Sequence, residues 1–92
     1  MHVSPREHVA TTWGLSAEEA GSLAGEDLPA LERATGVLVT YLRPEALAHV
    51  VRRPAERLGG RSLLELALAG EGSGVETAVR AIFDFEAASR AT

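Results

Sequence analysis

A helix start signal, serine followed three residues later by glutamate, occurs four times in this chain. In this arrangement the serine side chain accepts a hydrogen bond from the glutamate backbone, and the glutamate side chain reaches back to the serine backbone. The pairs are Ser4 with Glu7, Ser16 with Glu19, Ser62 with Glu65, and Ser73 with Glu76. Each pair precedes hydrophobic residues at helical spacing. The chain is therefore expected to fold as a series of helices.

Glycines mark the expected helix ends, because glycine readily adopts the left-handed conformation that closes a helix. They are Gly14, Gly25, Gly59 and Gly70. Between these signals, hydrophobic residues three or four apart predict one long helix from Asp27 to Leu42. The face of this helix that carries Leu28 and Leu42 is also a candidate dimer surface. Strand-like alternation occurs nowhere in the sequence.

The second half of the chain predicts three further helices separated by short turns. Pro44 begins a short helix that ends before Pro54, and a glycine-rich loop follows it. Ser62 to Ala69 is the next helix, and residues 71–74 are a turn into the last one. The sequence therefore predicts an all-α single small domain of about six helices.

Composition limits the number of domains, the covalent and metal chemistry, and the contact with membranes and nucleic acids that this chain can have. The 92 residues suffice for one domain, and none of them is a cysteine, so disulfides and thiolate metal sites are excluded. No hydrophobic run approaches the ~20 residues of a membrane span. The formal net charge of −4 disfavours nucleic acid unless one face is basic. A cytoplasmic protein that does not bind membranes is expected.

Side chains that could carry out catalysis are few. His2, His8 and His49 do not have metal-binding spacing, and no nucleophile has a base at a recognisable distance. We therefore expect no enzyme activity, no catalytic residue, no metal and no cofactor.

Three aromatic residues are more informative. Trp13 is expected in the core rather than at an interface. Phe83 and Phe85 lie about 200° apart around a helix axis, so they cannot both face inward. We expect Phe85 to be exposed or to lie at an interface.

A cluster of basic residues, Arg52, Arg53, Arg57 and Arg61, surrounds Pro54 and the glycine-rich loop. These side chains could bind phosphate or an acidic partner, or they could contact only water and nearby glutamates. The cluster is a candidate binding site whose ligand the sequence leaves open.

An ordered set of motifs in the second half resembles the toxin-binding domain of Xre/MbcA/ParS-type antitoxins. The set extends from about Leu28 to Ala88 and consists of Val50-Val51-Arg52-Arg53-Pro54, Leu58-Gly59-Gly60-Arg61-Ser62-Leu63-Leu64-Glu65-Leu66, Gly70-Glu71-Gly72, and Val75, Val79 and Ile82. In that family a helix ends near a proline, a Leu-Gly-Gly turn leads into a leucine-rich helix, and a glycine turn opens the terminal helix. Val50-Val51 departs from the Trp-Leu pair that many members carry.

The resemblance implies a function and a partner. It implies a type II antitoxin that binds and inhibits a RES-domain toxin, an enzyme that depletes NAD, and that performs no chemistry itself. The family places the terminal helix near the toxin, and a homodimer is common. The partner-binding residues expected by position are Arg57, Leu58, Gly59, Gly60, Arg61, Phe83, Phe85, Glu86, Ser89 and Arg90.

The N-terminal part is where the chain departs most from that family. Residues 13–20 resemble the opening of a helix-turn-helix, but Glu26, Asp27 and Glu32 stand where a recognition helix needs groups that bind bases and phosphates. We therefore expect residues 1–27 to be a truncated or degenerate helix-turn-helix-like unit with little or no DNA binding, and residues 28–92 to be the toxin-binding domain. The alternatives are a small helix-turn-helix-type transcriptional regulator that binds DNA, and a helical interaction protein unrelated to toxins.

Overall fold

The computed structural model describes the backbone of residues 4–91 and the side chains of residues 4–83. In this part of the chain all regular structure is helical. The α-helices are α1 (Pro5–Trp13), α2 (Ala17–Ser22), α3 (Leu28–Tyr41), α4 (Pro44–Val50), α5 (Leu63–Leu68) and α6 (Gly72–Ala91), and the 3-10 turns are η1 (Gly25–Asp27) and η2 (Glu56–Leu58). The predicted all-α fold with about six helices in one small domain is confirmed.

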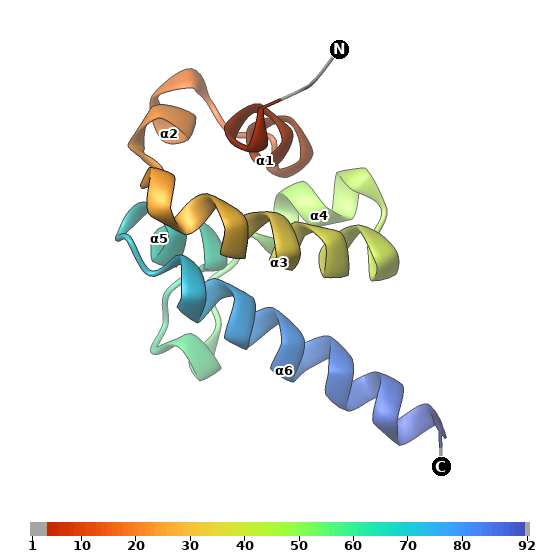
Figure 1. Ribbon diagram of the computed structural model, residues 1–92. Helices are drawn as coiled ribbons and strands as arrows, with labels where there is room; N and C mark the ends of the chain where they lie inside the picture. The colour runs from red at the N-terminus through yellow and green to blue at the C-terminus, as the bar shows by residue number, and fades with distance from the viewer. Residues whose placement is uncertain (1–3, 92) are drawn as a thin grey trace.

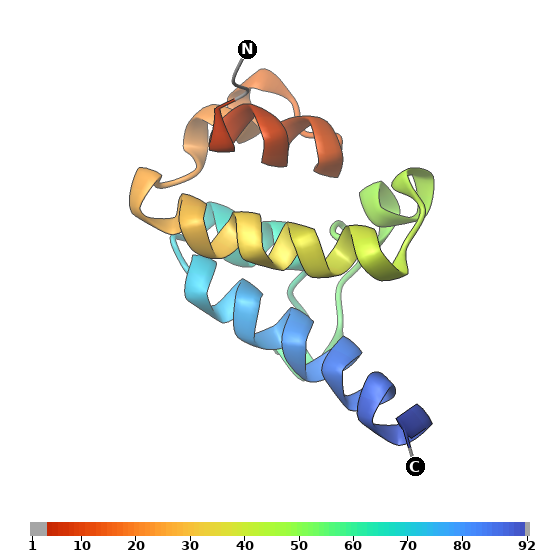
Figure 2. The same cartoon turned by 45° about the vertical axis from the view of Figure 1, so that its right-hand side comes forward.

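Helix α3 runs through the middle of the molecule. Helices α1 and α2 lie on one side of it and α6 lies on the other (Figures 1 and 2). Contacts link α3 with α1, with α4 and most extensively with α6. A central position requires a helix that is apolar over a wide arc, and the buried residues of α3 are Ala30, Leu31, Ala34, Thr35 and Leu38.

Two of the four predicted helix starts form as complete capping boxes. At Ser16 and at Ser62, the serine side chain accepts from the glutamate backbone and the glutamate side chain accepts from the serine backbone. At Ser4 the serine accepts a 3.2 Å hydrogen bond from the Glu7 backbone. The predicted start at Ser73 is wrong, because α6 already begins at Gly72.

Three of the four glycines predicted to end a helix do so. Gly14, Gly59 and Gly70 have positive φ, as predicted. Gly25 is not a helix end, since α2 stops at Ser22 and Gly25 opens η1. A guanidinium takes the place of the glycine there: Arg6 Nη1 donates to the carbonyl oxygens of Ala20 and Leu23 at 2.6 and 2.7 Å. A cationic side chain thus binds one carbonyl in the last turn of α2 and that of the C-cap residue Leu23.

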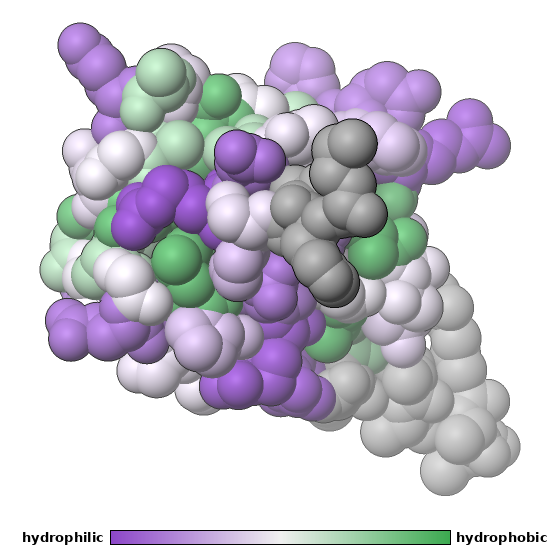
Figure 3. Space-filling model, turned by 45° about the horizontal axis from the view of Figure 1, so that its top comes forward, coloured by the Kyte–Doolittle hydropathy of each residue, from purple (hydrophilic) through white to green (hydrophobic). Residues whose placement is uncertain are grey.

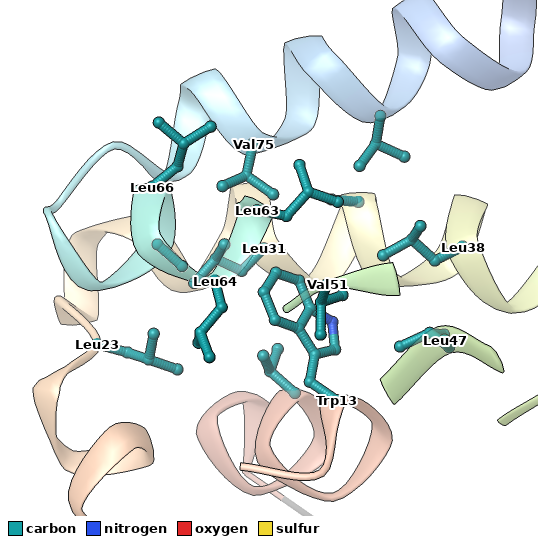
Figure 4. Close-up of a cluster of buried hydrophobic side chains, with 14 residues drawn as sticks. Trp13, Leu23, Leu31, Leu38, Leu47, Val51, Leu63, Leu64, Leu66 and Val75 are labelled. Atoms are coloured by element: carbon teal, nitrogen blue, oxygen red, sulfur yellow. The ribbon is translucent and has the colours of Figure 1, made fainter. Parts of the chain in front are cut away.

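The core is continuous from the first helix to the last. Trp13 lies at its centre, with its ring among Leu31, Val51 and Leu64 (Figure 4). Its indole Nε1 donates a 2.9 Å hydrogen bond to the hydroxyl of the buried Thr35. That hydroxyl donates in turn to the Leu31 carbonyl at 2.7 Å. The expectation that Trp13 belongs to the core is confirmed.

The predicted division of the chain between residues 27 and 28 does not separate two cores. Val9, Trp13 and Leu23 belong to the same buried cluster as the residues of α3 to α6. The face of α3 that the sequence offered for dimerisation is also occupied, because Leu31 and Leu38 are fully buried inside the protein's own core. The middle of that face is therefore not available to a second copy, while Leu28 and Leu42 at its ends are half-buried.

Polar and charged residues cover much of the surface seen in Figure 3, with hydrophobic residues exposed between them in separate places. Within the described residues, no helix is both long enough and apolar enough to cross a membrane.

Candidate functional site

The glycine-rich loop predicted to bind a partner is a closed turn. The Ala55 backbone N–H donates to the Arg61 carbonyl at 3.1 Å, and the Gly60 N–H donates back to the Ala55 carbonyl at 3.0 Å. Gly59 and Gly60 both have positive φ, 69° and 83°. Two consecutive left-handed residues are strained for any residue with a Cβ atom, so glycine is needed at both positions for this turn.

An ion pair joins this loop to the start of α6. Arg61 Nη1 lies 2.7 Å from a carboxylate oxygen of Glu71, and both side chains are 46% exposed. Exposed pairs of this kind contribute little to stability, about 0–1 kcal/mol. The pair does engage Arg61, so the charge of Arg61 is already balanced within the protein.

An open groove of about 420 Å³ separates the loop from α6. The loop side is formed by Arg57 and Leu58. The helix side is formed entirely by small residues, namely Ser73, Gly74, Thr77, Ala78 and Ala81. Two of the ten predicted partner-binding residues therefore line the groove directly.

The predicted arginine cluster divides into residues with different surroundings. Arg52 donates to both carboxylate oxygens of Glu19, at 2.8 and 3.0 Å, and to the Gly14 carbonyl at 3.0 Å. Through these bonds it joins the end of α4 to the turn between α1 and α2. Arg53 and Arg57 form no ion pair with any side chain that the structure describes. The four arginines are thus not one binding site.

The Arg52–Glu19 pair has an electrostatic consequence. The hydrogen bond from Arg52 lowers the pKa of Glu19 from 4.5 to about 2, helped by the backbone N–H of Ser16. The same hydrogen bond raises the pKa of Arg52. Glu19, which was expected to cap α2, therefore also links α2 to the segment that follows α4.

Phe83 lies on a different side of α6 from the groove. Its ring stacks on Tyr41 of α3, with centroids 5.0 Å apart and planes 11° from parallel. Phe83 follows Ala81 by two residues, about 200° around the helix axis. Phe83 and the loop are therefore not brought together on one surface.

The remaining predicted site residues, Phe85, Glu86, Ser89 and Arg90, lie on the last turns of α6, and their side chains are outside the described residues. The ribbon of α6 does show where this segment runs. Its C-terminal half extends away from the other helices in both views (Figures 1 and 2).

The small residues of α6 are the part of the site that sequence analysis missed. Their signal was present, since Gly74, Ala78 and the set Ser73, Thr77, Ala81 recur at intervals of four residues and so share one helix face. Nothing in the sequence, however, showed that residues 57 and 58 would lie opposite that face.

Other candidate chemistry remains dispersed. Among the described residues, no three histidine, aspartate or glutamate side chains are grouped as metal ligands. His8 Nδ1 lies 3.3 Å from a carboxylate oxygen of Glu32, where both side chains are well exposed.

Helix α3, which follows α2 where a recognition helix would be expected, lies between α1 and α6 (Figure 2).

In comparisons with known proteins, no protein-family model, no curated protein and no solved structure matches this chain.

Proposed function

We propose that this protein is an antitoxin-like adaptor that binds a RES-domain, NAD-depleting toxin and inhibits it by forming a complex. The resemblance of residues 28–88 to the toxin-binding domain of Xre/MbcA/ParS-type antitoxins is the basis of this proposal. On this proposal the protein works in the cytoplasm and contributes no catalytic group.

One structural observation supports the proposal most directly. The Leu-Gly-Gly loop and the start of the terminal helix, which are separate motifs in the sequence, lie on the two sides of one open groove. The backbone of the C-terminal half of α6 also extends away from the other helices (Figure 1). Surfaces of this kind suit protein binding better than catalysis, which needs convergent reactive groups.

Co-expression with the protein encoded by the adjacent gene tests the proposal. We expect that protein alone to stop growth and to lower cellular NAD, and we expect this chain to restore both and to co-elute with it in size-exclusion chromatography. Growth arrest that this chain does not relieve, or an adjacent protein that is not toxic, would contradict the proposal.

A gel-shift titration with the promoter DNA distinguishes the regulator alternative. The proposed function predicts no tight complex. Tight binding that weakens steeply with salt, in proportion to the number of phosphates contacted, would favour the regulator instead.

A further inference from the structure

We infer that the groove between η2 and α6 is the docking site for an acidic α-helix of the partner protein, with Arg57 binding a carboxylate of that helix. This inference rests on the proposed function, because it assigns the partner to the toxin. It goes further in naming the surface, the kind of segment that binds and the charge that the segment carries.

Charge is the first argument for an acidic occupant. Arg33, Arg52, Arg61 and Arg80 each pair with a glutamate of this protein. Arg57 lines the groove and pairs with no carboxylate in the described part of the chain. The protein is net acidic, with 13 carboxylate residues against nine arginines, yet none of the described carboxylates forms an ion pair with this side chain. An acidic group from outside complements Arg57, and a guanidinium can bind a carboxylate through two parallel hydrogen bonds.

The shape of the groove is the second argument. On its α6 side, Thr77 and Ala81 are exposed, while Gly74 and Ala78 are half-buried. Between Ser73 and Ala81, no large side chain of α6 lines the groove, so the backbone of another helix can approach this part of α6 closely, near the lower end of the usual 8–10 Å between packed helices. Leu58 forms an apolar wall on the loop side. The occupant is therefore a helix with apolar or small residues on one side and an aspartate or glutamate at its edge.

Rigidity of the loop is the third argument. The hydrogen bonds between Ala55 and the residues Gly60 and Arg61 close the turn, and the Arg61–Glu71 pair ties it to the start of α6. The loop side of the groove is thus held by hydrogen bonds within the protein itself. A preformed site loses less conformational entropy on binding than a loop that must first become ordered.

Binding measurements with the full chain and the purified adjacent-gene protein test the inference. Arg57→Glu reverses the charge at the groove, and Ala81→Phe fills it from an exposed position. We expect each variant to weaken the complex at least about tenfold, because hot-spot substitutions at interfaces have effects of that size or larger. Arg57→Ala, a milder surface change, should weaken binding less than Arg57→Glu.

Matched controls separate the groove from general effects of charge and size. Arg43→Glu makes the same charge change at an exposed arginine where α4 begins, and Ala46→Phe makes the same size change at an exposed alanine of α4. Both should bind within about twofold of wild type, as expected for substitutions outside an interface. Circular dichroism and thermal unfolding would confirm that all variants are folded.

The outcomes separate this inference from the proposed function. A wild-type complex that Arg57→Glu and Ala81→Phe weaken no more than their controls would overturn the docking site and leave the antitoxin function intact. Absence of any complex with the wild-type chain would overturn the proposed function and, with it, this inference. Rescue of Arg57→Glu by an aspartate- or glutamate-to-arginine change on one helix of the partner would identify the segment that binds.

Discussion

Arginines on both sides of α3 bind groups of the protein itself, but the α6 side also has one that borders an open groove. On the α1 side, Arg6 binds carbonyls at the end of α2, and Arg52 binds Glu19 and the Gly14 carbonyl. On the α6 side, Arg33, Arg61 and Arg80 likewise pair with glutamates, but Arg57 lines a groove and has no such partner among the described residues. Arginines that bind the protein's own backbone and carboxylates hold the scaffold together, whereas one that borders an open groove remains available for another molecule.

The α1 side also contributes the largest buried side chain of the core. Trp13 is fully buried there, with its only polar atom bonded to Thr35. The α6 side combines buried valines, Val75 and Val79, with the small, partly exposed residues of the groove. We therefore expect substitutions on the α1 side to act mainly on stability and those at the groove to act mainly on binding.

The largest expected effect is at Trp13. Trp13→Ala should lower the free energy of unfolding by about 3–5 kcal/mol, because it empties the centre of the core and leaves Thr35 without its donor. Urea unfolding measures this loss. It is followed by circular dichroism rather than by tryptophan fluorescence, because the variant removes the one tryptophan of the chain. Val39→Ala, at a side chain 51% exposed, is the control and should stay within about 0.5 kcal/mol. Equal effects of the two variants would contradict the central role of Trp13.

A smaller effect is expected on the α6 side at Gly72. A Cβ atom there would lie 2.5 Å from Cβ and 2.8 Å from Cγ of Asp27, and 3.2 Å from its Cα. Gly72→Ala should therefore destabilise the protein by about 1–3 kcal/mol, as overpacking usually does.

The matched control for Gly72→Ala is Gly36→Ala, which should change stability in the opposite direction. A Cβ at Gly36, in the middle of α3, would meet no atom within 4 Å. Gly36→Ala should raise stability by about 0.5–1 kcal/mol, because alanine favours helix more than glycine does. Thermal unfolding of both variants checks the prediction, and a stabilising Gly72→Ala would show that Asp27 can move away.

The next largest change in stability is expected at Ser62, the serine that caps α5. Ser62 is 2% exposed and accepts a 3.1 Å hydrogen bond from the Glu65 backbone. Ser62→Ala should lower stability by about 1 kcal/mol. Ser73→Ala should change it by less than about 0.5 kcal/mol, because Ser73 is exposed and lies inside α6 rather than at its cap. A similar loss for both serines in urea unfolding would contradict this difference.

The smallest effect is the pH dependence of the Arg52–Glu19 pair on the α1 side. The pKa of Glu19 is about 2 in the folded protein against 4.5 for the free side chain, so its contribution to stability is complete above pH 4.5 and is lost as the pH falls toward 2. Both partners are partly exposed, which keeps the contribution small.

Glu19→Gln should accordingly reduce the drop in melting temperature between pH 5 and pH 2. Glu18→Gln is the control, since Glu18 is exposed and forms no ion pair with a described residue. A pH profile that Glu18→Gln flattens as much as Glu19→Gln does would mean that the Arg52 pair has no particular role.

Local rules predicted most of the helices. The long helix expected from Asp27 to Leu42 is α3, Leu28–Tyr41, and the starts at Ser16 and Ser62 form with both of their hydrogen bonds. The failures have tertiary causes. Gly25 was not needed as a helix end because Arg6, far away in sequence, binds the carbonyls of α2. Glu76 does not cap α6, since its carboxylate binds Arg33 of α3 and Arg80.

The candidate site was predicted only in part for a similar reason. Leu58-Gly59-Gly60-Arg61 could be recognised as a turn from the sequence, and the two positive φ values explain its glycines. Which arginine of the cluster would face a groove depended on where Glu19 and Glu71 lie in space. That information is absent from the local pattern.

The sequence by itself therefore determined the helices, the all-α fold and the burial of Trp13, because capping and hydrophobic periodicity act over a few residues. Tertiary structure alone decided that Arg52 and Arg61 are engaged within the protein, that Phe83 stacks on Tyr41, and that Arg57 borders a groove on α6. Each of these depends on contacts between residues distant in the chain, which exist only after the helices have packed.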